Sequence, residues 1–529
     1  MKGKNLYILL FLVPLLFAQC ANQVAPTGGA KDITPPKVVQ ALPENKSMGF
    51  NGRKIEVAFD EYVTLNNASQ QVLFSPPLAE KPDIKLSNKT VVIKLKEDLK
   101  PNTTYTIDFG EAVKDLHEGN TFKDYTYTFS TGDILDTLNL SGTVLDAETG
   151  KPVEKLFVGL YKDQPDSLYN LPCLQAPDYL SRTDKDGHFH FHGLPDEPFL
   201  VFALEDMNAN LYYDLPNEKV AFLDSLVCPS DSISLSLKAF TELDTTQMLL
   251  ESKLVEEGLL RFAFRRPADS VAVQIDQPAI DSFQLVQVWS AHYDTLSCWF
   301  TPNLIDSLRV RIQYDTLINI NNSFNLRFRD TKPRRKADSK ALKVGDNLKK
   351  KLLMPDDDFL LVFPEPITYI NIGMENRFEQ VDEYGLVFRP TLNDTTDYVL
   401  HIPDSVFFSV RGRTNDSLDF KFRRAQETDL GNIYIKVCPP EGKQAVVQLM
   451  DNKGKVLDQQ VVDGTMRVAF TQLLPDKYKL QAIIDTDRNG RWSPGNFHQR
   501  FLPETIVPYK DELDLKAGWD IDLDETWKL

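Results

Sequence analysis

Apolar and polar side chains alternate with a period of two through most of this chain, and this alternation restricts the fold more than any other feature. Runs such as residues 55–59, 90–95, 104–109 and 125–129 alternate or are β-branched, and clusters of Pro, Asn, Gly and Lys separate them. Several short strands within about 100 residues are typical of an antiparallel sandwich. We therefore predict an all-β protein of tandem antiparallel β-sandwich modules, and the 529 residues leave room for several.

Two loops rich in Asp and Asn indicate that part of the chain is repeated. One loop spans residues 206–217 and the other residues 485–496, and each follows an apolar, strand-like run. Acidic or amide residues occupy the first, third, fifth and twelfth places of both loops, with an aromatic residue at the eighth. Such self-similarity predicts an internal duplication.

Residues 1–19 have the pattern of a secretory signal peptide. Two lysines precede an apolar run, residues 6–18, which is too short and wrongly flanked to span a membrane. Residues 17–20 resemble a bacterial lipobox, with Gln19 where a small residue is usual. The resemblance implies lipidation of Cys20 and attachment to a membrane through that lipid. Secretion without a lipid is the alternative.

Two further resemblances concern the modules. The segments 34–36, 57–61 and 125–131 resemble bacterial Ig-like domains of surface and envelope proteins, and together with residues 25–29 they resemble the N-terminus of an uncharacterised lipoprotein family of the Bacteroidetes. Residues 140–153 followed by 183–195 resemble the transthyretin-like, carboxypeptidase-regulatory type of sandwich, and the same scheme returns near the C-terminus. In that family the module is a structural appendage and not a catalytic unit.

The predicted order of the chain follows from these patterns. It is a signal peptide (1–19), a tether (20–36), an Ig-like domain (37–134), a transthyretin-like domain (135–240), an Ig-like domain (241–330), a linker (331–350), an Ig-like domain (351–428) and a transthyretin-like domain (429–529).

The charge of the chain excludes one class of partner. The net charge of -17 and the pI near 5.0 argue against nucleic acid, because phosphate binding needs a clustered basic surface. The one basic cluster, residues 332–351, is interpreted as a solvated linker, with a contact to anionic lipid or polysaccharide as the alternative.

The two Asx-rich loops are the strongest candidates for a metal site. Oxygen ligands at alternate positions of a tight loop suit Ca²⁺. Both loops depart from the usual calcium pattern at the twelfth place, which holds Asn where a bidentate Glu is usual. The earlier loop also has Leu211 at the place where the pattern has glycine. Without metal the same residues make Asx-turns. A bound cation would stiffen the module. The candidate calcium ligands are Asp485, Asp487, Asn489 and Asn496, with Asp206, Asn208 and Asn210 in the earlier loop.

Histidines and cysteines offer weaker candidates. His188, His190 and His192 alternate, so a strand would point them to one face, where they could hold Zn²⁺ or Cu²⁺. A polar outer face that is rich in histidine is the favoured interpretation. Cys173 and Cys228 could form a disulfide outside the cytoplasm, or each could be a buried thiol.

A triplet of Asp, then Ser or Thr, then an aliphatic residue or Thr recurs along the chain, where average composition would give about two or three. It resembles the O-glycosylation acceptor of exported Bacteroidetes proteins, although the same triplet also begins a strand after a turn. The candidate acceptors are Thr137, Ser167, Ser225, Ser232, Thr245, Ser270, Thr295, Ser307, Thr316, Thr395, Ser405 and Ser417.

Two functions fit these features. The first is a non-catalytic envelope lipoprotein that acts as a scaffold or binding module for an envelope protein or a glycan. No acidic run follows Cys20, which favours the periplasmic face of the outer membrane. The second is a carbohydrate-active hydrolase or its accessory subunit. No Gly-x-Ser-x-Gly elbow, His-Glu-x-x-His or phosphate-binding loop is present, so we expect no enzyme. A cleft between modules lined by converging carboxylates would favour the hydrolase.

Overall fold

The structure is a computed structural model and describes residues 32–529, apart from residues 124, 164–169, 244–246, 257, 269–270, 278–284, 302–306, 315–321, 328–340, 371–376 and 390–396. The predicted signal peptide, Cys20 and most of the tether lie outside the described residues. So do five of the predicted glycan acceptors, Ser167, Thr245, Ser270, Thr316 and Thr395. In the part that is described, no helix has the length and hydropathy needed to cross a membrane.

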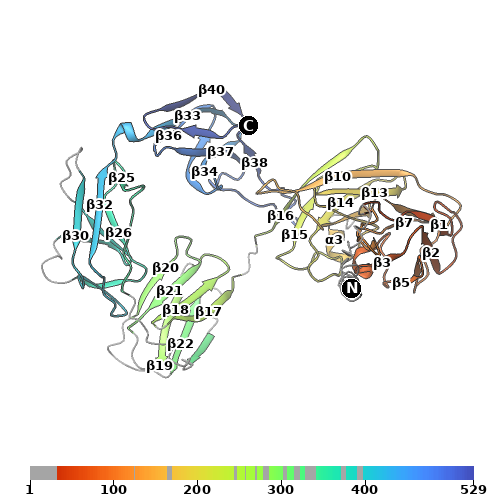
Figure 1. Ribbon diagram of the computed structural model, residues 1–529, viewed down its shortest axis with the longest axis horizontal. Coiled ribbons are helices and arrows are strands. Elements are labelled where there is room, and N and C mark those ends of the chain that lie inside the picture. The colour runs from red at the N-terminus through yellow and green to blue at the C-terminus, as the bar shows by residue number, and fades with distance from the viewer. Residues whose placement is uncertain are drawn as a thin grey trace, which may run out of the picture. The chain divides into compact units, whose positions relative to one another are not determined.

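Nearly all of the regular secondary structure in the described chain is β-strand, which confirms the all-β fold class (Figure 1). Helix in the described residues is confined to short turns, such as α2 (Ala68–Gln71), α3 (Leu171–Leu174) and the 3₁₀ turn η4 (Glu427–Asp429). The fold divides into two compact units. Unit 1 comprises Met1–Leu145, Pro152–Asp214 and Ala221–Ala239, and unit 2 comprises Asp146–Lys151, Leu215–Val220 and Phe240–Leu529.

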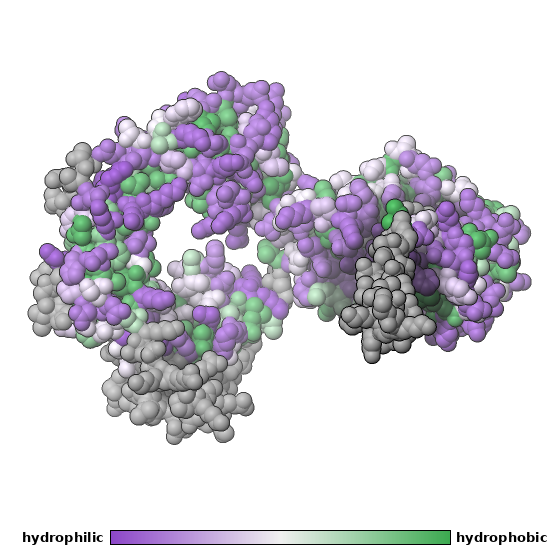
Figure 2. Space-filling view, viewed as in Figure 1, coloured by the Kyte–Doolittle hydropathy of each residue, from purple (hydrophilic) through white to green (hydrophobic). Residues whose placement is uncertain are grey.

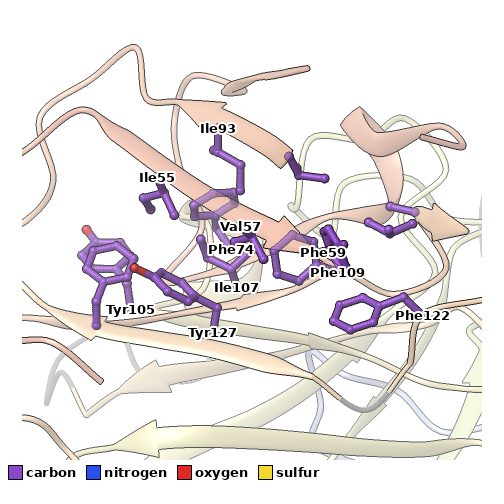
Figure 3. Packing of buried hydrophobic residues seen from close by; sticks show 14 of the residues in the cluster. Ile55, Val57, Phe59, Phe74, Ile93, Tyr105, Ile107, Phe109, Phe122 and Tyr127 are labelled. Carbon is purple, nitrogen blue, oxygen red and sulfur yellow. The ribbon is translucent and has the colours of Figure 1, made fainter. Parts of the chain in front are cut away.

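The first sandwich is the predicted N-terminal Ig-like domain. Its strands form three antiparallel groups: β1 (Val38–Leu42), β2 (Lys54–Phe59), β6 (Thr90–Lys94) and β5 (Asp83–Ser87); β4 (Leu73–Ser75), β7 (Thr104–Asp108) and β9 (Thr126–Ser130); and β3 (Val63–Leu65) with β8 (Val113–Asp115). Ile55, Val57 and Phe59 alternate along β2 and point into the core, where Figure 3 shows them above Ile107 and Tyr127. The side chains that alternate as apolar in the sequence of β2 are therefore the ones that are buried.

The second sandwich is built on one seven-stranded sheet. Its order is β12 (Tyr179–Arg182), β11 (Phe157–Lys162), β14 (Phe199–Leu204), β15 (Lys219–Phe222), β16 (Ser234–Thr241), β10 (Leu138–Asp146) and β13 (His188–Leu194). The two outer strands meet, because Ser181 Oγ on β12 donates to the carbonyl oxygen of His190 on β13 at 2.7 Å. Phe189 and Phe191 are buried between the layers, as predicted.

The third and fourth sandwiches follow. The third consists of β17 (Leu249–Glu256), β18 (Leu259–Phe264), β21 (Thr295–Trp299) and β20 (Val286–Trp289), and of β19 (Val271–Gln277), β22 (Ser307–Tyr314) and β23 (Asn322–Arg327). The fourth consists of β24 (Gly345–Asp346), β26 (Phe359–Val362), β29 (Gly385–Phe388) and β28 (Glu379–Asp382); of β25 (Leu352–Leu353), β32 (Leu418–Arg424) and β30 (Tyr398–Ile402); and of β27 (Ile367–Ile370) with β31 (Phe407–Ser409). Leu342 is buried in the fourth core, so this sandwich begins inside the range expected as a linker.

The fifth sandwich shares its strand pairing with the second. One sheet contains β36 (Met466–Leu473), β33 (Gly431–Cys438) and β40 (Asp520–Lys528). The other contains β35 (Val456–Asp463), β34 (Gln444–Asp451), β37 (Asp476–Asp485) and β38 (Thr505–Pro508), with β39 (Leu513–Leu515) also on β37. The pairs β33·β36, β34·β35, β34·β37 and β37·β38 correspond in chain order to β10·β13, β11·β12, β11·β14 and β14·β15. This is the pairing that the predicted internal repeat requires.

The sandwiches are not purely antiparallel as predicted. The pairs β25·β32 and β33·β40 are parallel. In each pair the two strands lie far apart in sequence, and parallel strands need such a crossover connection, which no hairpin can provide.

Candidate functional site

The Asx-rich loop of the fifth sandwich begins where β37 ends, at the fully buried Asp485. Its two carboxylate oxygens accept hydrogen bonds from the backbone nitrogens of Asn489 (3.2 Å) and Gly490 (2.9 Å), and Gln444 on the neighbouring β34 donates from Nε2 at 2.7 Å. Burial alone would raise the pKa of Asp485, but the hydrogen bonds from Gly490 and Gln444 outweigh it and hold the pKa below its ordinary value. Asp485 is therefore an ionised anchor for the loop.

Two more carboxylates lie beside Asp485. Asp487 accepts hydrogen bonds at Oδ2 from Asn489 Nδ2 (2.8 Å) and Ser493 Oγ (2.7 Å). Glu504, which directly precedes β38, is 3% exposed and accepts from the backbone nitrogen of Ser493 at 3.0 Å. One oxygen from each of Asp485, Asp487 and Glu504 lies within 4.8 Å of the other two. Three negative charges therefore gather in one partly buried place.

Glu504 was not among the ligands predicted from the sequence. It placed Asn496 at the twelfth ligand position, but the side-chain oxygen of Asn496 accepts from the backbone nitrogen of Gln499 (2.7 Å) in a separate turn. A motif of fixed length misses Glu504, because a loop of variable length precedes it. The signal in the sequence is a glutamate directly before the strand that follows each loop, Glu218 before β15 and Glu504 before β38, and the structure buries both.

The earlier loop has the same backbone. Asp206 accepts hydrogen bonds from the backbone nitrogens of Asn210 (3.1 Å) and Leu211 (2.8 Å), as Asp485 does in the later loop. Leu211 adopts a positive φ of 64° at the place where Gly490 has 76°. A Cβ at Gly490 would meet nothing within 4 Å, so a side chain at this place meets no steric clash and costs only the strain of the left-handed backbone that Leu211 adopts.

The two loops carry one of their carboxylates at different places. In the earlier loop Asp214 accepts from Asn208 Nδ2 (3.0 Å) and from Asn210 Nδ2 (2.7 Å). In the later loop the carboxylate is at the third place, Asp487, and the ninth place is Ser493. In the earlier loop the third place is Asn208, and the carboxylate is at the ninth place, Asp214. Within the described residues, only the later loop gathers three carboxylates closely enough to hold a metal ion.

The three predicted histidines lie on the exposed face of β13, opposite Phe189 and Phe191. His188 Nδ1 lies 2.9 Å from Thr143 Oγ1, and His192 Nδ1 lies 2.9 Å from Asn139 Oδ1. Because both rings are held by polar neighbours and no metal-ligand group among the described residues includes them, the polar face is the better interpretation.

Cys173 and Cys228 are not joined by a disulfide. Of the predicted glycan acceptors that the structure describes, Thr137, Ser225, Ser232 and Ser417 are exposed, and Thr295 and Ser405 are half-buried. Thr137 and Ser417 immediately precede β10 and β32, while Thr295 and Ser307 begin β21 and β22. These positions fit both a glycosylation acceptor and the start of a strand after a turn.

A second candidate site is a cleft of about 550 Å³ in unit 1, where the first two sandwiches meet. Four carboxylates and two lysines line it together with a tyrosine, namely Asp133, Asp136, Asp178, Glu197, Lys100, Lys162 and Tyr179. None of these residues was predicted as a site residue, because they come from different modules and no local spacing relates them.

Comparison with known proteins supports the first module. The model of the Bacterial Ig-like domain family matches residues 32–131, which confirms the predicted N-terminal Ig-like domain. No curated protein matches the chain.

Solved structures align with the chain only weakly. The N-terminal part of the bacterial S-layer protein SbsC is 15% identical, covering 37% of this chain and 43% of that one, with a TM-score of 0.14. BcpA, the major pilin subunit of Bacillus cereus, is 12% identical, covering 74% and 99%, with a TM-score of 0.15. The Bacillus anthracis TIE protein is 10% identical, covering 95% and 75%, with a TM-score of 0.15. Scores this low do not establish a common fold over the whole chain.

Proposed function

We propose that this chain is a non-catalytic lipoprotein of a bacterial cell envelope, whose β-sandwiches serve as a scaffold or binding module. The observation that carries the proposal is the bacterial Ig-like domain at residues 32–131, shortly after the predicted lipidation residue Cys20. A lipid on Cys20 would hold the first sandwich close to a membrane. Charged and polar residues cover most of the face seen in Figure 2, which suits a module in an aqueous compartment. We place it on the periplasmic face of the outer membrane.

Membrane fractionation tests the anchor. We expect the wild-type chain in the membrane fraction and Cys20→Ala in the soluble fraction, because the substitution removes the attachment atom. Cys228→Ala, which alters an exposed cysteine, is the matched control and should stay with the membrane. A Cys20→Ala chain that remains membrane-bound would contradict the proposal.

We further propose that Ca²⁺ binds the later Asx loop and stiffens the fifth sandwich. Asp485, Asp487 and Glu504 supply hard oxygen ligands. Arg488 in the same loop forms its ion pair with Asp463 (3.2 Å) and not with these three carboxylates. A divalent cation would neutralise the three gathered charges. The earlier loop, which carries Asn208 in place of Asp487, should bind more weakly.

Thermal unfolding with and without Ca²⁺ tests this proposal. Millimolar Ca²⁺ should raise the Tm of the wild-type fifth sandwich, since a ligand that binds only the folded state stabilises it. The increase should vanish in Glu504→Gln and persist in Glu441→Gln, which alters an exposed glutamate in the turn after β33. An equal increase in both variants would place the ion elsewhere.

The alternative of a carbohydrate-active hydrolase is favoured by one observation, the carboxylate-lined cleft of unit 1. Two of the four cleft carboxylates already have partners in the fold, since Glu197 pairs with Lys162 Nζ (2.9 Å) and Asp178 Oδ2 accepts from the backbone nitrogen of Lys162 (2.9 Å). We therefore propose binding and not hydrolysis. Release of reducing ends from envelope polysaccharides by the purified chain, abolished in Asp136→Asn, would reverse this conclusion.

A further inference from the structure

The cleft of unit 1 is held open by contacts between the two sandwiches. The backbone nitrogen of Leu180 donates to Ser75 Oγ (3.0 Å), a buried bond that joins β12 to β4. The backbone nitrogen of Asp136 donates to Thr104 Oγ1 at 2.9 Å, beside the cleft itself. A site that is already formed does not spend binding free energy on ordering its walls.

Tyr179 presents its hydroxyl to this cleft. The residue is only 4% exposed, and its ring packs edge-on against Phe199 with the centroids 5.6 Å apart. The hydroxyl has no hydrogen-bond partner among the described residues, although Tyr179 lines the cleft. Burial and then the charges of Asp136, Glu197 and Asp178 raise the pKa of Tyr179, so the phenol remains protonated at physiological pH.

The charges around this hydroxyl are unbalanced. Lys162 Nζ pairs with Glu197 (2.9 Å), and the backbone nitrogen of Lys162 donates to Asp178 Oδ2 (2.9 Å). The carboxylates of Asp133 and Asp136 form no ion pair or hydrogen bond within the described chain. With four carboxylates against two lysines, the lining of the cleft carries excess negative charge beside a neutral hydroxyl that can accept a hydrogen bond.

We propose that the cleft binds a ligand through a primary ammonium group, which the Asp136 carboxylate and the Tyr179 hydroxyl hold. An ammonium group offers three donors and one positive charge, which match these two acceptors. The tyrosine ring is buried, so the cleft offers no aromatic face on which a neutral sugar could stack. Lys100 and Asn102 line the cleft too and can meet hydroxyl or amide groups of the same ligand. The volume of about 550 Å³ suits a ligand of a few sugar or amino-acid residues.

An amino sugar and a lysine side chain share this chemistry, and titration calorimetry on the full chain can distinguish them. One arm uses a glucosamine trimer against an N-acetylglucosamine trimer, and the other uses the tripeptide Gly-Lys-Gly with its N-terminus acetylated against the same peptide acetylated also at Nε. Each pair differs in the charge of the amine. We expect one charged probe to bind and its acetylated partner not to bind, with affinity falling as salt rises.

Two variants locate the binding. Tyr179→Phe removes only the hydroxyl, and Asp136→Asn removes a charge that has no partner in the fold. Each should weaken the affinity for the charged probe about tenfold, the effect of one lost charge-assisted hydrogen bond. Asp186→Asn, which alters an exposed turn carboxylate of the same sandwich, should leave it unchanged. Equal binding of charged and acetylated probes, no binding of either charged probe, or affinities that ignore Tyr179→Phe and Asp136→Asn would each overturn the proposal.

This inference rests on the proposed binding role, but the titration does not involve the anchor. Failure of the titration would leave membrane attachment through Cys20 intact. Failure of the fractionation experiment would leave the cleft and its ligand class intact.

Discussion

At the residue scale, single carboxylates organise the turns of this protein. Asp115, at the end of β8, is 3% exposed and accepts four backbone hydrogen bonds at 2.6–3.0 Å. Their donors are the backbone nitrogens of His117, Glu118, Gly119 and Asn120. Burial acts to raise the pKa of Asp115, but these hydrogen bonds outweigh it and lower the pKa to about 2. The turn is therefore built around an ionised side chain.

This lowered pKa predicts an acid-sensitive first sandwich. The folded pKa of about 2 lies below the ordinary 3.8, so the carboxylate stabilises the fold above pH 3.8, and that stability is lost as the pH falls towards 2. Urea unfolding between pH 2 and pH 7 should show a shallower pH dependence in Asp115→Asn than in the wild type. The exposed Asp186→Asn should follow the wild type. Parallel profiles for all three proteins would show that Asp115 does not govern the turn.

The sequence predicts local turns but not the contacts between residues far apart in the chain. The Asx pattern predicted Asp485, Asp487 and Asn489 correctly as neighbours in one loop, because local spacing determines a turn. It could not supply Glu504, which β38 brings to the loop, or relate Tyr179 to Asp136 across two modules. Contacts of that kind depend on sheet pairing and on the packing of sandwiches.

At the element scale, the period of two predicted strands and their buried faces well. The burial of β2 and β13 alternates as the sequence does. The fully buried β14, in contrast, has no alternation, as expected for a strand covered on both faces. Pairing was harder to predict. In the second sandwich β15 pairs with β16 and joins all strands into one sheet, whereas the fifth sandwich keeps two sheets.

One glycine tests the packing of these strands. A Cβ at Gly142 on β10 would lie 2.6 Å from the carbonyl oxygen of Leu235 and 2.6 Å from Phe189 Cζ. Gly142→Ala should therefore lower the free energy of unfolding of the second sandwich by about 1–3 kcal/mol, as overpacking does. At Gly345 the nearest atom to a Cβ would be 3.5 Å away, so Gly345→Ala should be nearly neutral by calorimetry. Equal stabilities of the two variants would contradict this packing.

At the scale of the whole molecule, each of the five sandwiches has a hydrophobic core among the described residues, and smaller contacts join neighbouring sandwiches within each unit. In unit 2 the third and fourth sandwiches share a small core of Leu259, Trp299 and Val410. Trp299 Nε1 donates to the hydroxyl of Tyr384 at 2.7 Å across the same joint. Neighbouring sandwiches are therefore joined by packed side chains as well as by linkers. The hydrophobic periodicity of the sequence does not predict these contacts.

A buried ion pair should control this joint. Arg411, with a side chain 7% exposed, contacts Glu256 (2.7 Å) and the buried Glu365 (3.3 Å). Arg411→Ala leaves Glu365 without its closest cation and should cost about 3–5 kcal/mol, seen as faster hydrogen exchange in β17, β21 and β27. The double variant Arg411→Leu/Glu365→Leu should recover most of the loss, because it leaves no uncompensated charge. Unchanged exchange in Arg411→Ala would show that the joint does not depend on the pair.

The intact mass of the protein purified from its native membrane tests whether this chain is an anchored envelope lipoprotein, as we propose. We predict a mass equal to residues 20–529 plus acyl chains on Cys20. Regular sugar increments above that mass would establish that the chain is glycosylated. A mass equal to the polypeptide cleaved after Gln19, with neither lipid nor sugar, would contradict both the anchor and the glycans and leave a secreted β-sandwich protein.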